Sequence, residues 1–182
     1  MSFGYATAEF EVTEERLGVY RPEEHIDNPL GYADGIDARN LEPRLRGPVD
    51  PVETQIDPRT GMKNYIANEQ GHWATSAGYL RYSFGRSIHY GRQYLHGSHG
   101  GGKGKEEDLC EALRCLGQAL HTMEDFSAHS NYCELVLRDM GMHEVYPHSG
   151  AATEIVLPNG KRVFPLVTGT FGVVDFVHSV IG

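Results

Sequence analysis

The sequence has few cysteines, no long hydrophobic run and no excess of positive charge, and each absence excludes a class of protein. Its three cysteines, Cys110, Cys115 and Cys133, are too few and odd in number for a disulfide framework, so we interpret them as free thiols. No apolar stretch is long enough for a transmembrane helix. With 16 Lys and Arg against 25 Asp and Glu, the net charge of -9 argues against a nucleic acid partner.

Size and composition place the chain among single-domain proteins. It has 182 residues, 40% of them hydrophobic, which is enough to bury a substantial core. The first ten residues contain no basic stretch followed by an apolar one, so we recognise no signal peptide. We expect one domain over residues 1–182.

Proline and glycine punctuate residues 21–62 and leave no helical or strand periodicity there. Apolar side chains such as Ile26, Tyr32 and Leu45 are nevertheless spread through this segment, which is unusual for disorder. The pattern favours an ordered, extended coil over the surface of the domain. Residues 57–61 form a turn sequence, because proline fixes φ and glycine closes the turn.

Two long helices are predicted over residues 73–96 and 106–130, and the glycine-rich connector between them indicates an antiparallel pair. Each helix has a row of apolar residues at three- and four-residue spacing, which we expect to face the core. The rows are Trp73, Ala77, Leu80, Phe84, Ile88, Gly91 and Leu95 in the first helix, and Leu109, Leu113, Leu116, Leu120 and Met123 in the second.

The last part of the chain carries signals for a β-hairpin and a final helix. Asn159-Gly160 is a strong two-residue hairpin turn, and the flanking residues predict strands within residues 154–164. A helix capped near Thr170 is expected over residues 170–181. The predicted fold is mainly α: antiparallel helices with a long Pro-rich coil and one small β-hairpin.

His121, Asp125 and His129 recur at every fourth residue of the second helix, which places them on one face about one turn apart. Imidazole and carboxylate groups suit zinc, and three protein ligands with an open position make a catalytic site. By helical phase the triplet lies opposite the apolar row, so it either faces solvent or lines a polar cleft under a second element. A solvated polar face is the alternative interpretation.

Other ligand-type side chains lie elsewhere in the predicted elements. They are His89 in the first helix, Glu134 and His148 after the second, and Asp175 and His178 in the final helix. Glu134 can reach the triplet only if the chain bends after the second helix. We therefore predict a zinc site at His121, Asp125 and His129 that some of these residues complete.

Four stretches of the chain together carry a family resemblance: YIANE (65–69), WATS (73–76), ALRCLGQALHTMEDFSAHSNYCEL (112–135) and FPLVTGTFG (164–172). These stretches resemble the fungal Het-C heterokaryon-incompatibility proteins. The resemblance covers essentially the whole chain and implies a role in self/nonself recognition between fungal cells, with another Het-C allele product or other incompatibility protein as partner. It also implies an internal piece of a larger Het-C domain, whose full-length members carry a secretion signal and are secreted or at the cell periphery.

The run from His121 to His129 is also similar to the zinc-dependent phospholipase C and single-strand nuclease group, which are all-helical enzymes with clustered zinc ions. This chain departs from that group in the spacing before the third ligand, and ligands upstream of Met1 are absent from it. The similarity implies metal-assisted hydrolysis of a phosphodiester, with membrane lipid as a natural substrate, in which zinc lowers the pKa of a bound water. The competing hypothesis is a recognition module without catalysis, in which metal is structural or absent.

Overall fold

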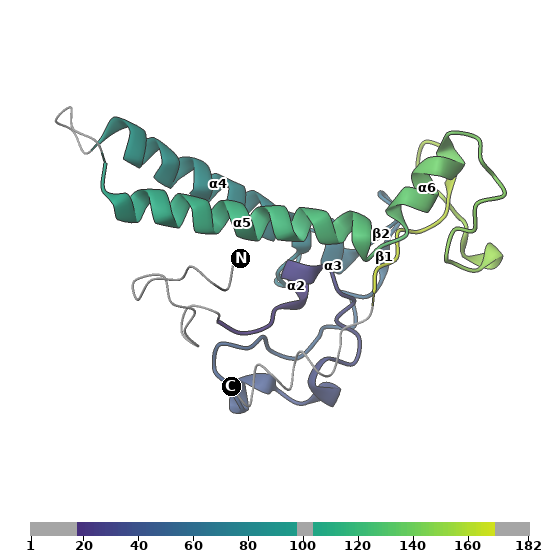
Figure 1. Ribbon diagram of the computed structural model, residues 1–182. Coiled ribbons are helices and arrows are strands. Elements are labelled where there is room, and N and C mark those ends of the chain that lie inside the picture. Colours follow the sequence, from purple (N-terminus) through teal and green to yellow (C-terminus); the bar gives the residue numbers. More distant parts are fainter. Residues whose placement is uncertain (1–17, 98–103, 170–182) are drawn as a thin grey trace.

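The computed structural model describes residues 18–97 and 104–169 and confirms the predicted mainly α fold (Figure 1). Two long helices, α4 (Ser76–His96) and α5 (Glu106–Ala128), form an antiparallel hairpin. The expected helix over residues 170–181 lies outside the described residues. Within the described ranges, no helix has both the length and the apolar character needed to cross a bilayer.

Local capping sets where the long helices begin. Helix α4 starts at Ser76 rather than at Trp73, because the side-chain oxygen of Thr75 accepts a hydrogen bond from the Gly78 N–H at 3.0 Å. This bond satisfies one of the amides that the first turn of a helix leaves unpaired. Helix α5 opens with three acidic residues, 106–108, which the positive end of the helix dipole favours.

Small side chains are buried where α4 and α5 are in contact. Ala112, Cys115 and Ala119 of α5 are buried, as are Ser76 and Ser83 of α4. Such residues allow two helices to pack closely, with little side-chain bulk between their axes. The seam is polar further along, where the Arg86 guanidinium lies 3.2 Å from the Glu111 carboxylate.

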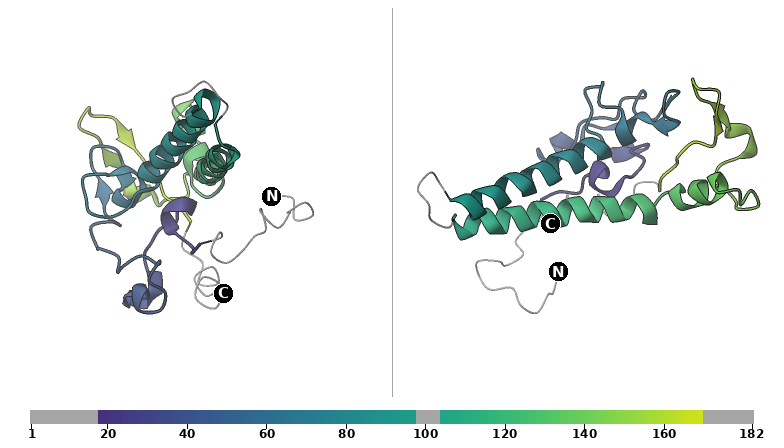
Figure 2. Two further views of the ribbon diagram at one scale, coloured as in Figure 1. Left: turned by 90° about the vertical axis from the view of Figure 1, so that its left-hand side faces the viewer. Right: turned by 90° about the horizontal axis from the view of Figure 1, so that it is seen from above.

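No residue of either apolar row is buried among the described residues, so the prediction that the rows face the core is wrong. Ile88 and Leu95 of α4 are 54% and 72% exposed, and Leu113, Leu120 and Met123 of α5 are 57%, 47% and 53% exposed. The described coil, with its short helices, packs on another side of the hairpin (Figures 1 and 2). The hydrophobic spacing identified the apolar side of each helix, but the two helices pack against each other through their small residues.

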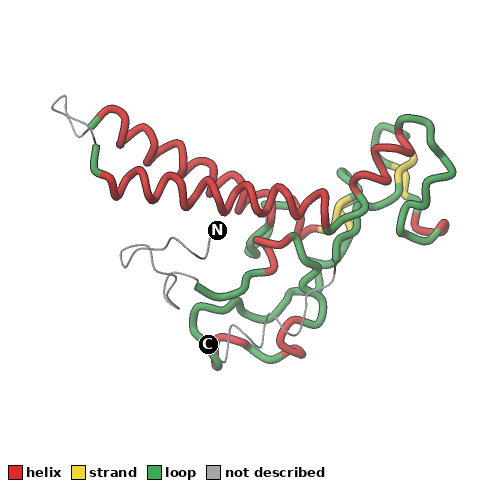
Figure 3. Tube along the Cα trace, viewed as in Figure 1, coloured by secondary structure: helices red, strands yellow, loops and turns green. Residues whose placement is uncertain are grey.

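The Pro-rich segment is an ordered coil beside the hairpin, as the loop trace in Figure 3 shows. It contains short helical turns, α2 (Pro22–His25), η2 (Tyr32–Gly35) and η3 (Ala38–Asn40), which are too brief to leave a periodic pattern. A small core holds the segment together; its buried members are Val19, Tyr32, Ala33, Ala38 and Leu45.

A second β-hairpin, which was not predicted, forms around the turn at residues 57–61. Strand β1 (Ile56–Asp57) pairs antiparallel with β2 (Met62–Lys63), and Gly61 adopts a φ of 76° that glycine tolerates best. The short helix α3 (Asn64–Ala67) follows directly. Its Tyr65 is buried, which raises the pKa of the phenol to about 12, and the hydroxyl is 2.5 Å from the Thr168 hydroxyl.

The predicted hairpin is present but has very short strands. Strand β3 (Ile155–Val156) pairs antiparallel with β4 (Arg162–Val163) across the Asn159-Gly160 turn. A short helix, α6 (Tyr132–Asp139), and the turn η4 (Ala151–Thr153) precede it.

Asn131 organises the break between α5 and α6. Its buried side-chain amide donates hydrogen bonds to the carbonyl oxygens of Pro147, at 2.7 Å, and Pro165, at 3.2 Å. Its side-chain oxygen accepts one from the Val167 N–H at 2.9 Å. Asn131, which follows the end of α5, is therefore hydrogen-bonded to the chain on both sides of the β3–β4 hairpin.

Candidate metal centre

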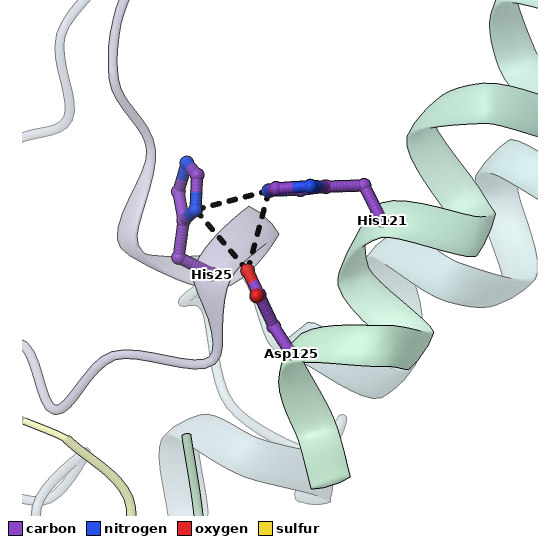
Figure 4. A group of neighbouring side chains, drawn as sticks. All are labelled: His25, His121 and Asp125. Carbon is purple, nitrogen blue, oxygen red and sulfur yellow. Dashed lines mark hydrogen bonds and ion pairs between the residues drawn. The ribbon is translucent and has the colours of Figure 1, made fainter. Parts of the chain in front are cut away.

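Three side chains from two distant parts of the sequence converge beside the C-terminal half of α5 (Figure 4). His25 comes from α2, and His121 and Asp125 come from α5. The Asp125 Oδ2 atom lies 3.2 Å from His25 Nδ1 and 3.2 Å from His121 Nε2. The two ring nitrogens are themselves 3.2 Å apart, so the three donor atoms form a nearly equilateral triangle.

Helix α5 supplies two of these groups because their four-residue spacing places them on successive turns of one face. Asp125 is only 4% exposed, which agrees with the alternative that this face of the helix lies under a second element rather than in solvent. The side chain of His121 is 50% exposed. Consequently α5 presents a buried carboxylate next to an imidazole that solvent reaches.

The coil presents His25 through a short, terminated helix. Pro22 occupies the first turn of α2, where its fixed φ and missing N–H suit a helix start. Ile26 ends the helix in the left-handed region with φ of 55°, and its side chain is 1% exposed. The conformational strain of a β-branched residue in this region is about 1–3 kcal/mol, so packing around the buried Ile26 must stabilise the turn. Tyr20 stacks on the His25 ring with centroids 4.6 Å apart.

The triangle has the dimensions of a zinc site. A tetrahedral zinc with ligand bonds of about 2.0–2.1 Å separates its ligand atoms by about 3.3 Å, close to the 3.2 Å found here. Within the described part of the chain, the buried Oδ2 atom of Asp125 accepts no hydrogen bond, and the two imidazole nitrogens beside it are ion-pair partners only when their rings are protonated. Buried carboxylate oxygens normally have a partner, and between neutral imidazoles a cation equidistant from the three donors would supply it. The three residues could therefore hold a metal ion.

His129, the third member of the predicted triplet, lies on the other oxygen of Asp125. Its Nε2 atom is 3.5 Å from Oδ1, and its side chain is 57% exposed. The Gly169 N–H donates to the His129 carbonyl at 2.8 Å, and the Asn28 N–H donates to the Gly169 carbonyl at 2.9 Å. These bonds join the coil and the end of α5, so Asp125 is held between histidines on both of its oxygens.

The other predicted ligands lie in separate places. His89 is on α4, where its ring is 3.0 Å from the Gln93 amide. It is level with the first turns of α5, about three turns from His121. Glu134 and His148 pair with each other at 3.7 Å. Asp175 and His178 lie outside the described residues.

A protonatable carboxyl borders the triangle. Burial raises the pKa of Glu24, the neighbour of His25 in α2, and a hydrogen bond with Tyr79 opposes that rise only in part. Burial, and then the charge of Glu24, raise the pKa of Tyr79 in turn. The site therefore combines three donor atoms with an adjacent carboxyl that keeps its proton to higher pH than usual.

Sequence reasoning missed His25. It lies in the Pro-rich coil, and nothing in its spacing relates it to residues 96 positions later. The one local signal is a run of ligand-type side chains, Glu23, Glu24, His25 and Asp27, between two prolines. Such a run is common on exposed turns and so carries little weight by itself.

Comparison with known proteins gives one match. The family model described as heterokaryon incompatibility protein Het-C matches residues 1–182. No curated protein and no solved structure matches the chain. The match spans the coil, the helical hairpin and both β-hairpins, and the chain therefore belongs to the Het-C family of heterokaryon incompatibility proteins.

Proposed function

We propose that this chain binds a zinc ion through His25, His121 and Asp125 and serves heterokaryon incompatibility as a metal-dependent hydrolase of phosphodiesters or phospholipids. The observation that carries the proposal is the triangle of donor atoms, 3.2 Å on each side, around a buried carboxylate oxygen without a hydrogen bond. The exposure of His121 and His129 supports an open position that a substrate reaches.

The chemistry follows from the donor set. Zinc with three protein ligands and an open fourth position lowers the pKa of a bound water to about 7 and polarises a phosphoryl oxygen. His129 orients Asp125 from its second oxygen, as partners of ligating carboxylates do. Glu24, with its raised pKa, is placed to carry a proton beside the site. Membrane lipid is the proposed substrate class, although a nucleotide ester has the same reacting group.

A recognition module with a structural metal, or with none, is the second candidate. Its support is that His25 belongs to the coil and His121 to the helical hairpin, so a shared ion would fasten the two together. In that case the coil surface would meet another Het-C allele product or other incompatibility protein. The hydrolase and a module with structural metal share the metal site and differ in turnover, whereas a module without metal would hold no ion there.

Zinc content tests the site itself. The purified chain, dialysed against trace zinc, should hold one ion per chain by elemental analysis. His25→Ala and His121→Ala should lose it, whereas His129→Ala and the matched control His89→Ala should retain it. If His25→Ala retains zinc and His129→Ala loses it, the ion is bound by the helical triplet His121, Asp125 and His129 and not by the triangle that includes His25. Equal zinc in all four variants would end the proposal.

Turnover separates the two functions. A zinc-loaded chain should hydrolyse a chromogenic phosphocholine ester, and a chelator or His121→Ala should abolish the reaction while His89→Ala leaves it unchanged. Bound zinc without hydrolysis of phosphocholine or nucleotide esters would favour the recognition module. Hydrolysis that survives both the chelator and His121→Ala would come from a contaminant and would refute the metal mechanism.

A further inference from the structure

The α4–α5 hairpin carries a continuous apolar surface that the described chain does not cover. Five of its side chains are exposed by about half or more, and others between them are partly exposed. The exposed ones are Ile88, Leu95, Leu113, Leu120 and Met123, and the partly exposed ones are Leu80, Phe84, Leu109 and Leu116. Isolated surface leucines are ordinary, but contiguous rows of this kind mark interaction sites. We call these nine residues the apolar face.

Both rows lie on the same side of the hairpin. On each helix the row is rotated about a third of a turn from the residues in the interhelical contact, at 100° per residue and in the same sense. Because the two helices run antiparallel, an equal rotation brings the rows to one side. His121, which meets the coil, lies on the opposite flank of α5. The apolar face is therefore one surface, with the coil behind it.

The edges of the apolar face have opposite charges. By the same helical phase, Arg81 and Arg92 border it along α4, and Glu106 and Glu124 border it along α5, all of them exposed. Arg81 also pairs with Glu69. The Gly104 N–H donates to the Tyr94 carbonyl, so Arg92 and Glu106 lie at the same level along the hairpin. They are on opposite edges and so face away from each other within one chain.

We propose that the apolar face binds a second copy of this chain to form a four-helix bundle, with the two-fold axis parallel to the helices. In this arrangement α4 of each copy lies over α5 of the other, and all neighbouring helices are antiparallel. A two-fold axis parallel to the helices preserves the level of each residue. Arg92 of each copy then meets Glu106 of the other, at two equivalent places. A two-fold axis perpendicular to the helices would instead place α4 of one copy over α4 of the other. The arginine edges of the two copies would then face each other.

The size of the face suits a stable pair. Helices of 21 and 23 residues are about 30 Å long, and two packed side by side are about 18 Å wide. The projected area of about 550 Å² per copy approaches the roughly 800 Å² of accessible surface that a partner buries in a typical stable complex. The predominantly leucine content matches interfaces that resemble a domain core. This inference is independent of the metal site.

Sedimentation equilibrium of the full chain tests the proposal. The wild-type chain should have twice the mass of the 20.2 kDa monomer. Leu113→Glu with Leu120→Glu should raise the dimer dissociation constant by about two orders of magnitude. The matched control Leu30→Glu, an exposed leucine in the coil, should leave it unchanged. Far-UV circular dichroism should show equal helix content, because Glu is a good helix former.

A charge swap tests the orientation of the pair. Arg92→Glu and Glu106→Arg should each weaken the dimer, and the double variant should restore it, because the exchanged charges meet again across the two-fold axis. A double variant weaker than either single one would overturn this orientation. A wild-type chain that is monomeric at every concentration would overturn the dimer, and its co-sedimentation with phosphatidylcholine vesicles would assign the face to lipid instead.

Discussion

Asp125→Asn should separate a zinc site from a network of ion pairs, because the two predict different effects with and without metal. The substitution keeps the size of the side chain and nearly the same helix propensity, but removes the negative charge. Oδ2 accepts no hydrogen bond from the described residues, so asparagine at this position forfeits none there. At pH 8, where an imidazole is ordinarily neutral, the metal-free chain should therefore change in unfolding free energy by less than about 1 kcal/mol.

The zinc-loaded chain should respond much more strongly. A ligand present at 100 times its dissociation constant stabilises the folded state by about 2.7 kcal/mol, and a neutral amide is a poor zinc ligand. For a chain of this length, about 2–4 °C of Tm corresponds to 1 kcal/mol. Zinc should raise the wild-type Tm by about 5–10 °C and leave the Tm of the Asp125→Asn variant almost unchanged.

Thermal melts of both proteins, with zinc and with chelator, supply the four values required. The decisive quantity is the difference between the two zinc effects, since any loss common to both conditions cancels. A variant that loses as much stability in chelator as in zinc would show that Asp125 acts through ion pairs with its histidines. A wild-type Tm that does not respond to zinc would refute the metal site directly.

Three further predictions concern the scaffold. Hydrogen bonds from Arg114 hold the pKa of Glu111 at about 2, below its usual 4.5, so its contribution to stability is present above pH 4.5 and is lost as pH falls toward 2. In urea denaturation, Glu111→Gln should lower the unfolding free energy by about 1 kcal/mol at pH 7 and by progressively less below pH 4.5. A loss of unfolding free energy that does not depend on pH would contradict this. Asn131→Ala removes three hydrogen bonds, two of them buried, and should lower the unfolding free energy by about 2–4 kcal/mol in the same assay, whereas a loss under about 1 kcal/mol would show that water replaces them. Thr75→Ala should cost about 1 kcal/mol through loss of the cap to Gly78, and Thr75→Ser should cost much less; equal losses would assign the effect to the methyl group.

Local features of the fold were predictable because local physics determines them. The turn Asn159-Gly160 marks a hairpin whatever surrounds it, and apolar periodicity marks two long helices. The face on which those helices meet was not predictable from the same periodicity. Leu113 and Leu120 define the apolar side of α5 but stay exposed. Ala112 and Ala119 are buried in the contact with α4, because their small side chains let the two backbones approach closely.

The candidate site divides in the same way. His121 and Asp125 share one helix, so their proximity follows from a four-residue spacing. His25 joins them through tertiary packing of a coil that has no repeating pattern. The position of the coil depends on contacts such as Asn28 with Gly169, which a single sequence does not reveal.

His25 and His121 are 96 positions apart in the sequence, so the proposed zinc ion would also hold two distant parts of the chain together. An ion bound by both residues would act as a reversible cross-link. By the chain-entropy model, a cross-link that closes a loop of about 100 residues lowers the conformational entropy of the unfolded chain, which stabilises the folded state by about 4–5 kcal/mol. Removing the metal would then detach the Pro-rich coil from the α4–α5 hairpin before either long helix unfolds. Trypsin should then cleave at Arg39 and Arg44, which are exposed in the coil, sooner in the metal-free protein than in the metal-bound one.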